Sequence, residues 1–157
     1  MIKEVSDEET VLEDDSEILE FEAESEPSKT EEKTDNDRDA YLKTSLEALG
    51  IDYGAGMRYC MGSLSFYEEI LNDFVKNYDE KSKGLNSAYE DRDTDSYAIV
   101  AHSLKSTSKM IGANDLSVKA RDMELSAKDK DISFVLDNHK ELTDMYKKTV
   151  EDIKKLL

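Results

Sequence analysis

Apolar residues recur at three- and four-residue steps along most of the chain, the spacing that places side chains on one face of a helix. The strongest example spans residues 64–78, with Leu64, Tyr67, Leu71, Phe74 and Tyr78 on one stripe. Ser63 precedes this stripe as an N-cap, since a serine hydroxyl accepts a hydrogen bond from a free N–H of the first turn. No stretch gives convincing evidence of a strand. The pattern therefore predicts an all-α protein.

The same spacing predicts further helices at 40–49, 96–111, 115–127 and 131–156, and a shorter one that resumes after Gly84. Glycine follows several of these stretches and is a common residue at the end of a helix. The glycine-punctuated segment 51–62 is assigned no helix. Long amphipathic helices with short connections favour an antiparallel four-helix bundle, with 40–49 as an additional short N-terminal helix packed across one end.

Charge divides the 157 residues into two parts. The first 39 residues hold 17 of the 38 acidic residues but four of the 21 basic ones, a net charge of −13 that leaves −4 for the rest. So many like charges oppose burial of the few apolar residues among them. We therefore expect residues 1–39 to be an acidic disordered tail or interdomain linker and 40–157 to be one helical domain. A sharper alternative is that residues 18–21 form a short docking segment.

Composition also excludes several classes of function. A net charge of −17 repels nucleic acid and anionic lipid, so neither is an expected partner. The chain has no apolar run near the roughly 20 residues of a membrane span and no signal-peptide pattern at its start, so we expect a cytoplasmic protein. The one cysteine, Cys60, excludes an internal disulfide and a cysteine-built zinc site. No metal-binding set of carboxylates stands out.

Chemistry is concentrated in one segment, residues 101–112, because the usual phosphate-loop, kinase, metalloprotease and serine-hydrolase motifs are absent from the sequence. On a helical wheel, His102 lies almost opposite the apolar stripe of this helix. Lys105, Ser106 and Lys109 fall on the histidine's own side, and so do two residues of the preceding turn, Ala98 and Ile99. An idle surface histidine is the plain alternative.

The neighbours of His102 favour a reactive role. A neutral imidazole is a nucleophile near neutral pH, and nearby ammonium groups stabilise negative charge that arrives on it. Lys105 is close enough in the helix to reach such an anion, while the small Ser106 leaves the ring approachable. A solvent-facing nucleophile beside positive charge, with no base or pocket of its own, suits a carrier of phosphoryl groups that other proteins load and unload.

The run His102-Ser103-Leu104-Lys105-Ser106-Thr107-Ser108, followed by Ile111-Gly112-Ala113 and Leu116, resembles the signature of histidine-containing phosphotransfer (HPt) domains of bacterial phosphorelays. The similarity extends from about Gly50 through residues 66–71 to the end of the chain. It implies that His102 is the phospho-acceptor and that Lys105 offsets the charge of the phosphoryl group. Ser106 stands where the family usually has glycine, and is a tolerated departure because it is small.

The resemblance implies a phosphocarrier of a two-component phosphorelay, without autokinase activity. His102 would accept a phosphoryl group from a phosphoaspartate on a response-regulator receiver domain and pass it to another receiver. Ser106 and Lys109 would be weaker helpers, and Ala98 and Ile99 would be exposed for partner docking. No cofactor is expected on this chain, since the resemblance places Mg²⁺ on the partner receiver.

Other interpretations remain open from the sequence. A helical adaptor would bind a receiver or kinase domain without phosphotransfer, and a phosphohistidine phosphatase would need a pocket and a base that the sequence does not indicate. The chain is either a free protein, expected to be a monomer, or the C-terminal part of a hybrid sensor histidine kinase, which the linker-like start favours. His139 is expected to be a partly buried packing residue, and Cys60 a small buried apolar one.

Overall fold

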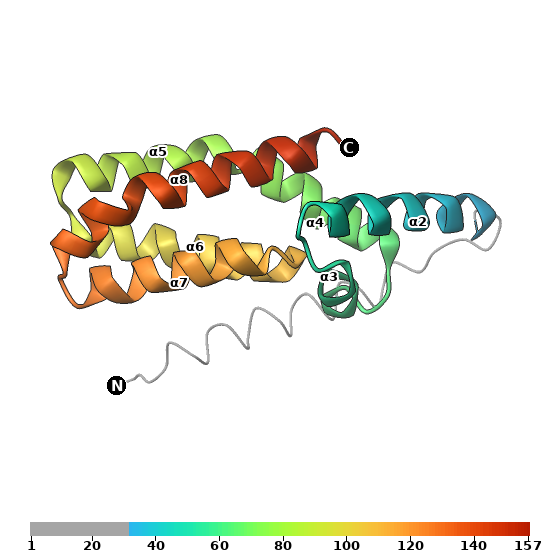
Figure 1. The fold of residues 1–157 in the computed structure, drawn as a ribbon, viewed down its shortest axis with the longest axis horizontal. Coiled ribbons are helices and arrows are strands. Elements are labelled where there is room, and N and C mark those ends of the chain that lie inside the picture. Colours follow the sequence, from blue (N-terminus) through green and yellow to red (C-terminus); the bar gives the residue numbers. More distant parts are fainter. Residues whose placement is uncertain (1–31) are drawn as a thin grey trace.

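The computed structural model describes residues 32–157, and these form helices without any strand, which confirms the all-α prediction (Figure 1). The helices are α2 (Glu32–Ala48), α3 (Tyr53–Tyr59), α4 (Leu64–Lys76), α5 (Tyr78–Asp91), α6 (Thr94–Ile111), α7 (Asn114–Lys128) and α8 (Ile132–Lys154). Residues 1–31 of the predicted disordered tail, with the docking segment at 18–21, lie outside this described part, whereas residues 32–39 of that tail belong to α2.

Helices α5, α6, α7 and α8 pack together as an antiparallel four-helix bundle, which confirms the predicted fold class (Figure 1). The helix predicted at 64–78 is α4, which also packs against α6 and α8 and is followed by α5. Connections of two or three residues join consecutive helices of the bundle, so each must reverse the direction of the one before. Each helix contributes at least one fully buried apolar side chain to the common core: Leu85, Leu104, Met123 and Leu142. Burial of these side chains from water is the main source of stability of such a bundle.

Helices α2 and α3 lie at the end of the bundle where α6 ends and α7 begins (Figure 1). The backbone N–H of Asp52, just before α3, donates a hydrogen bond of 2.8 Å to the carbonyl of Gly112, just after α6. Gly112 has a φ of 91°, and a Cβ there would lie 2.2 Å from the Asp52 carbonyl oxygen. Both the left-handed conformation and the close contact require glycine.

Two boundaries near the N-terminus differ from the sequence prediction. The helix expected at 40–49 begins at Glu32, and the segment 51–62 contains the short helix α3. The side chain of Asp52 caps α3 by accepting a hydrogen bond of 3.0 Å from the N–H of Ala55. A good N-cap therefore starts a helix in spite of the glycines that follow.

Gly84 does not interrupt a helix, so the predicted break there is wrong. It lies inside α5, where an added Cβ would come within 3.3 Å of the Val100 side chain on α6. A glycine here lets the two helices approach closely. Only Asn77 separates α4 from α5, and its carbonyl accepts a hydrogen bond of 3.1 Å from Lys81, so the two helices follow each other almost without interruption.

Candidate functional site

Helix α6 holds His102 on a side that its core-facing residues leave free. The carboxylate of Asp93 caps the start of the helix through the N–H of Ser96, at 3.1 Å, and Gly112 closes its end. The buried face of α6 includes Tyr97 and Leu104. The His102 side chain is 33% exposed, so the solvent-facing position expected from the helical wheel is partly covered.

The residue that contacts the His102 ring is Glu124 of α7, which the sequence analysis missed. Its Oε2 lies 2.7 Å from His102 Nδ1, and its side chain is only 2% exposed. Glu124 is 22 positions away in sequence, so local spacing gives no link between the two. One signal was present: Glu124 lies among the apolar residues of the buried face of α7, where a charged residue is rare unless it has a partner.

Two ammonium groups also contact the Glu124 carboxylate. Lys105 Nζ lies 2.8 Å from Oε1, and Lys128 Nζ lies 3.1 Å from Oε2. Burial acts to raise the pKa of Glu124, but the interactions with Lys105, Lys128 and His102 outweigh burial and hold the pKa below its usual value. Glu124 is therefore an ionised carboxylate at neutral pH, almost fully enclosed and surrounded by donors.

The charge of Glu124 determines which nitrogen of a neutral His102 ring is free. An ionised carboxylate can only accept hydrogen bonds, so Nδ1 must carry the proton and donate it to Oε2. The lone pair of a neutral imidazole then resides on Nε2. The arrangement presents a nucleophilic nitrogen on a ring whose orientation is fixed by a buried anion.

Ser106 and Lys109 lie apart from this charged cluster. They line an open groove of about 750 Å³ between α3, α6 and α7, and Lys105 contributes to the same wall. Within residues 32–157, no hydrogen bond or ion pair joins Ser106 or Lys109 to His102. The structure thus brings His102 and Lys105 together around Glu124, and places Ser106 and Lys109 in the adjoining groove.

The two residues expected to be open for docking differ in exposure. Ile99 is 71% exposed, in line with the helical wheel. Ala98 is only 6% exposed, so the expectation that it is exposed beside His102 is wrong. Helix α6 packs against both α5 and α7, and this leaves a narrower exposed face than an isolated helix has.

The described helices show neither a transmembrane element nor a cluster of metal ligands. In residues 32–157, no helix is both long and apolar enough to cross a membrane. The same residues contain no group of three or more His, Cys, Asp or Glu side chains placed to hold a metal ion.

Comparison with known proteins identifies the bundle. The family model described as Hpt domain matches residues 69–152, which is slightly more than half of the chain and includes His102, Lys105 and Glu124. Searches of curated proteins and of solved structures found no match. The matched region spans the bundle helices that position the buried carboxylate and the histidine. The chain therefore belongs to the Hpt domain family.

Proposed function

We propose that His102 accepts a phosphoryl group from a phosphoaspartate on a receiver domain and passes it to an aspartate of another receiver. Membership of the family establishes the coarser statement that the chain has a phosphotransfer role in phosphorelays. Hpt domains carry phosphoryl groups and are not kinases, and they interact with the receiver domains of response regulators. The assignment to His102 and the direction of transfer are the proposed steps.

The observation that carries the proposal is the hydrogen bond between His102 Nδ1 and Glu124 Oε2. In the proposed reaction, the lone pair of Nε2 attacks the phosphorus in line. A nitrogen–phosphorus bond forms while the bond to the aspartate oxygen breaks, and the aspartate leaves as a carboxylate. The proton on Nδ1 stays in place, and Glu124 balances the positive charge that develops on the ring.

The cations beside the ring support the same reaction. Lys105 lies on the helix of His102, one turn further on, and its ammonium group offsets negative charge on the transferred group. Ser106 and Lys109 are weaker helpers, placed to meet a partner that enters the adjoining groove. The proposal places Mg²⁺ and the acidic pocket on the receiver, so this chain contributes the nucleophile and its electrostatic surroundings.

Transfer from a loaded receiver tests the proposal. Receiver domains carrying radiolabelled phosphate, with Mg²⁺, are mixed with the wild-type chain, with His102→Gln and with the matched control His139→Gln. We expect label that survives alkali and is lost in acid on the wild type and on the folded control, but none on His102→Gln. Uptake of labelled phosphate by His102→Gln would refute the assignment of His102 as the phospho-acceptor. Binding without transfer across a panel of receivers would favour the adaptor.

A further inference from the structure

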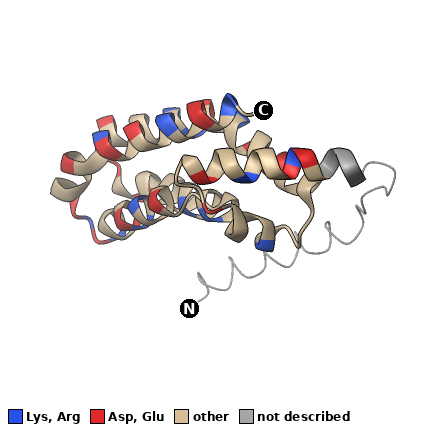
Figure 2. Ribbon diagram, turned by 45° about the vertical axis from the view of Figure 1, so that its right-hand side comes forward, with Lys and Arg blue, Asp and Glu red and all other residues tan. Residues whose placement is uncertain are grey.

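The groove between α3, α6 and α7 is basic, although the protein as a whole is strongly acidic. Its wall includes Arg58 from α3, Lys105 and Lys109 from α6, and Arg121 from α7, and none of its described lining residues is acidic. Elsewhere on the described helices, acidic and basic residues are interspersed (Figure 2). A groove with charge of one sign attracts a ligand of the opposite sign.

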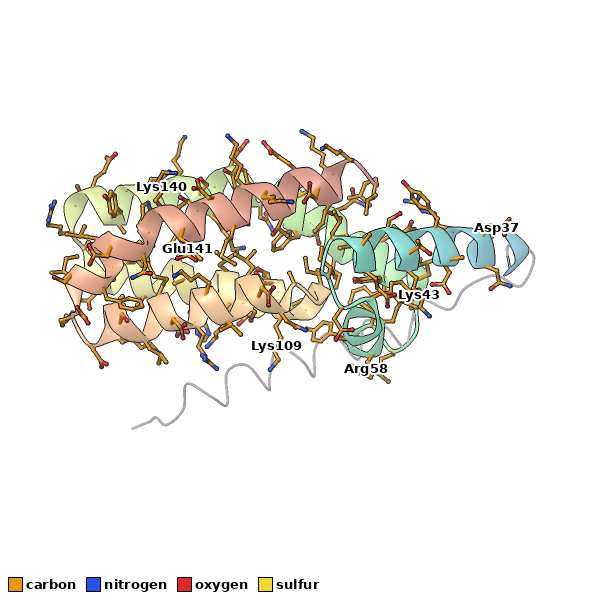
Figure 3. The ribbon with its side chains drawn as sticks, viewed as in Figure 1. Asp37, Lys43, Arg58, Lys109, Lys140 and Glu141 are labelled. Carbon is orange, nitrogen blue, oxygen red and sulfur yellow. The ribbon has the colours of Figure 1, made fainter. Side chains whose placement is uncertain are left out.

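Two of these cations have no anionic partner within residues 32–157. Lys105 pairs with Glu124, and Arg121 lies 3.5 Å from its neighbour Asp122. Arg58 and Lys109 are exposed, and no described carboxylate forms an ion pair with either. Figure 3 shows both side chains extending from their helices toward the same side of the molecule.

The groove also offers apolar surface. Val118 of α7 is exposed and Met110 of α6 is partly exposed, and both line the same groove as the cations. A ligand that fits must therefore combine negative charges with apolar side chains. A free anion would match the charge of the groove, but it would leave the apolar surface uncovered.

One segment of the chain has this chemistry. Residues 13–21, Glu-Asp-Asp-Ser-Glu-Ile-Leu-Glu-Phe, hold five acidic residues, no basic residue and three apolar ones, and they include the segment 18–21. We propose that residues 13–21 dock in this groove of their own chain, with carboxylates against Arg58 and Lys109 and apolar side chains against Met110 and Val118.

The connection between segment and groove is long enough. Helix α2 has 17 residues and is about 25 Å long, and the turn after its C-terminal end is hydrogen-bonded to Gly112 at the edge of the groove. The ten residues 22–31 span at most about 33–36 Å when extended. A tether of this length gives an effective concentration on the order of millimolar, so even a weak contact is populated.

Docking at this place affects phosphotransfer, a consequence that rests on the proposed function. Lys105 belongs both to the groove and to the charged cluster that contacts His102. A segment in the groove therefore competes with a receiver that approaches the ring. The acidic segment acts as a tethered inhibitor that an arriving partner must displace.

A nitroxide spin label on Ser16→Cys in the full chain tests the docking directly. Cys60 is fully buried, and mass spectrometry verifies that one label is attached. We expect the amide NMR signals of Lys109 and Val118 to lose most of their intensity. The amide signal of Glu90, at the other end of the bundle, should keep its intensity. Unchanged signals in the groove overturn the proposal, as does broadening that grows with protein concentration, which indicates a second copy.

Matched charge variants separate specific docking from general attraction. Glu13→Gln/Asp14→Asn/Glu17→Gln/Glu20→Gln should restore the groove signals, and so should Arg58→Glu/Lys109→Glu. The control Glu4→Gln/Asp7→Asn/Glu8→Gln/Glu9→Gln removes the same number of charges outside the segment and should leave the broadening in place. Equal recovery in the control overturns the choice of residues 13–21.

Phosphotransfer gives a separate test of the inhibition. Neutralising the segment should speed acceptance from a loaded receiver about threefold to tenfold, which corresponds to about 0.7–1.4 kcal/mol. An unchanged rate, with broadening present in the unneutralised chain, overturns the inhibition. If no variant accepts phosphate, the proposed function fails, while the spin-label result still decides whether the segment docks.

Discussion

The two histidines of this chain occupy opposite kinds of surroundings. His102 lies at the surface of the α6–α7 pair, where its Nδ1 contacts the Glu124 carboxylate at 2.7 Å. His139 of α8 is buried in the bundle, where its Nδ1 lies 2.8 Å from the Tyr97 hydroxyl and its Nε2 lies 2.8 Å from Asn86 Oδ1. The sequence predicted a partly buried packing histidine at this position, and the structure buries it further, to 6% exposed.

The partners of the two rings determine what each can do. Burial raises the pKa of Tyr97, so its hydroxyl stays protonated and donates to Nδ1 of His139, and Nε2 then donates to Asn86. Both nitrogens are occupied, and the ring stacks on Tyr89 with centroids 4.0 Å apart. At His102 the carboxylate occupies one nitrogen and leaves Nε2 available. The same side chain is a structural link in one place and a candidate nucleophile in the other.

Replacing each histidine by glutamine gives the largest contrast. His102→Gln should abolish phosphoryl acceptance and lower the free energy of unfolding by about 0.5–1.5 kcal/mol, the net contribution of one hydrogen bond, since Lys105 and Lys128 still contact Glu124. His139→Gln should retain acceptance but lose about 2–4 kcal/mol, because buried partners are left unsatisfied. Transfer assays and urea denaturation measure the two effects. Loss of acceptance in folded His139→Gln would contradict the division of roles.

Removing the carboxylate tests how far it sets the properties of His102. Glu124→Ala should slow phosphoryl acceptance about 10- to 100-fold, or about 1.4–2.7 kcal/mol in activation free energy, because neither tautomer nor ring orientation is then fixed. Glu124→Gln, which keeps an oxygen acceptor, should lose less. Nitrogen-15 NMR of the ring should show Nδ1 protonated in the wild type and a mixture of tautomers in Glu124→Ala. The same tautomer populations in the wild type and in Glu124→Ala would exclude a positioning role for Glu124.

As the pH falls, the lowered pKa of His139 should destabilise the folded protein before the carboxylate of Glu124 does. Burial lowers the pKa of His139 below 6.5, so in the interval below 6.5 the unfolded chain binds a proton that the folded chain does not. The free energy of unfolding should therefore fall as pH drops below 6.5, by at most about 1.4 kcal/mol per pH unit. Urea denaturation between pH 7.5 and 5 measures this slope, which His139→Gln should lose. An equal slope in that variant would assign it to other groups.

Glu124 adds a second loss at lower pH. Its pKa is lowered in the folded state, so its stabilising contribution is complete above the unfolded value of about 4.5 and disappears as pH falls through the folded value.

The two lysines that contact Glu124 give the smallest expected contrast. Lys105→Gln should slow phosphoryl acceptance about threefold to tenfold, because its ammonium group is one helical turn from His102 and adds to the charge that the phosphoryl group meets. Lys128→Gln removes a cation from the same carboxylate, on the other helix, and should slow acceptance no more than about twofold. Single-turnover transfer rates measure both, and a larger effect at Lys128 would reverse the assignment.

Features within one helix were predictable from the sequence because they depend on local spacing. His102 and Lys105 are three residues apart on α6, so their common side follows from helical periodicity. The turn at Gly112 also followed from a glycine after an apolar-periodic stretch. The same rule fails at Gly84, because this glycine allows the close approach of α5 to α6 and does not end a helix.

The sequence by itself determined the all-α class, the antiparallel bundle and the side of α6 that bears His102, because a period of 3.6 residues sorts side chains within each element. It could not show that Glu124 contacts His102, that Ala98 is covered or that Arg58 joins Lys109 along one groove. These facts depend on the register and rotation of neighbouring helices, which the packing of side chains from the whole bundle decides.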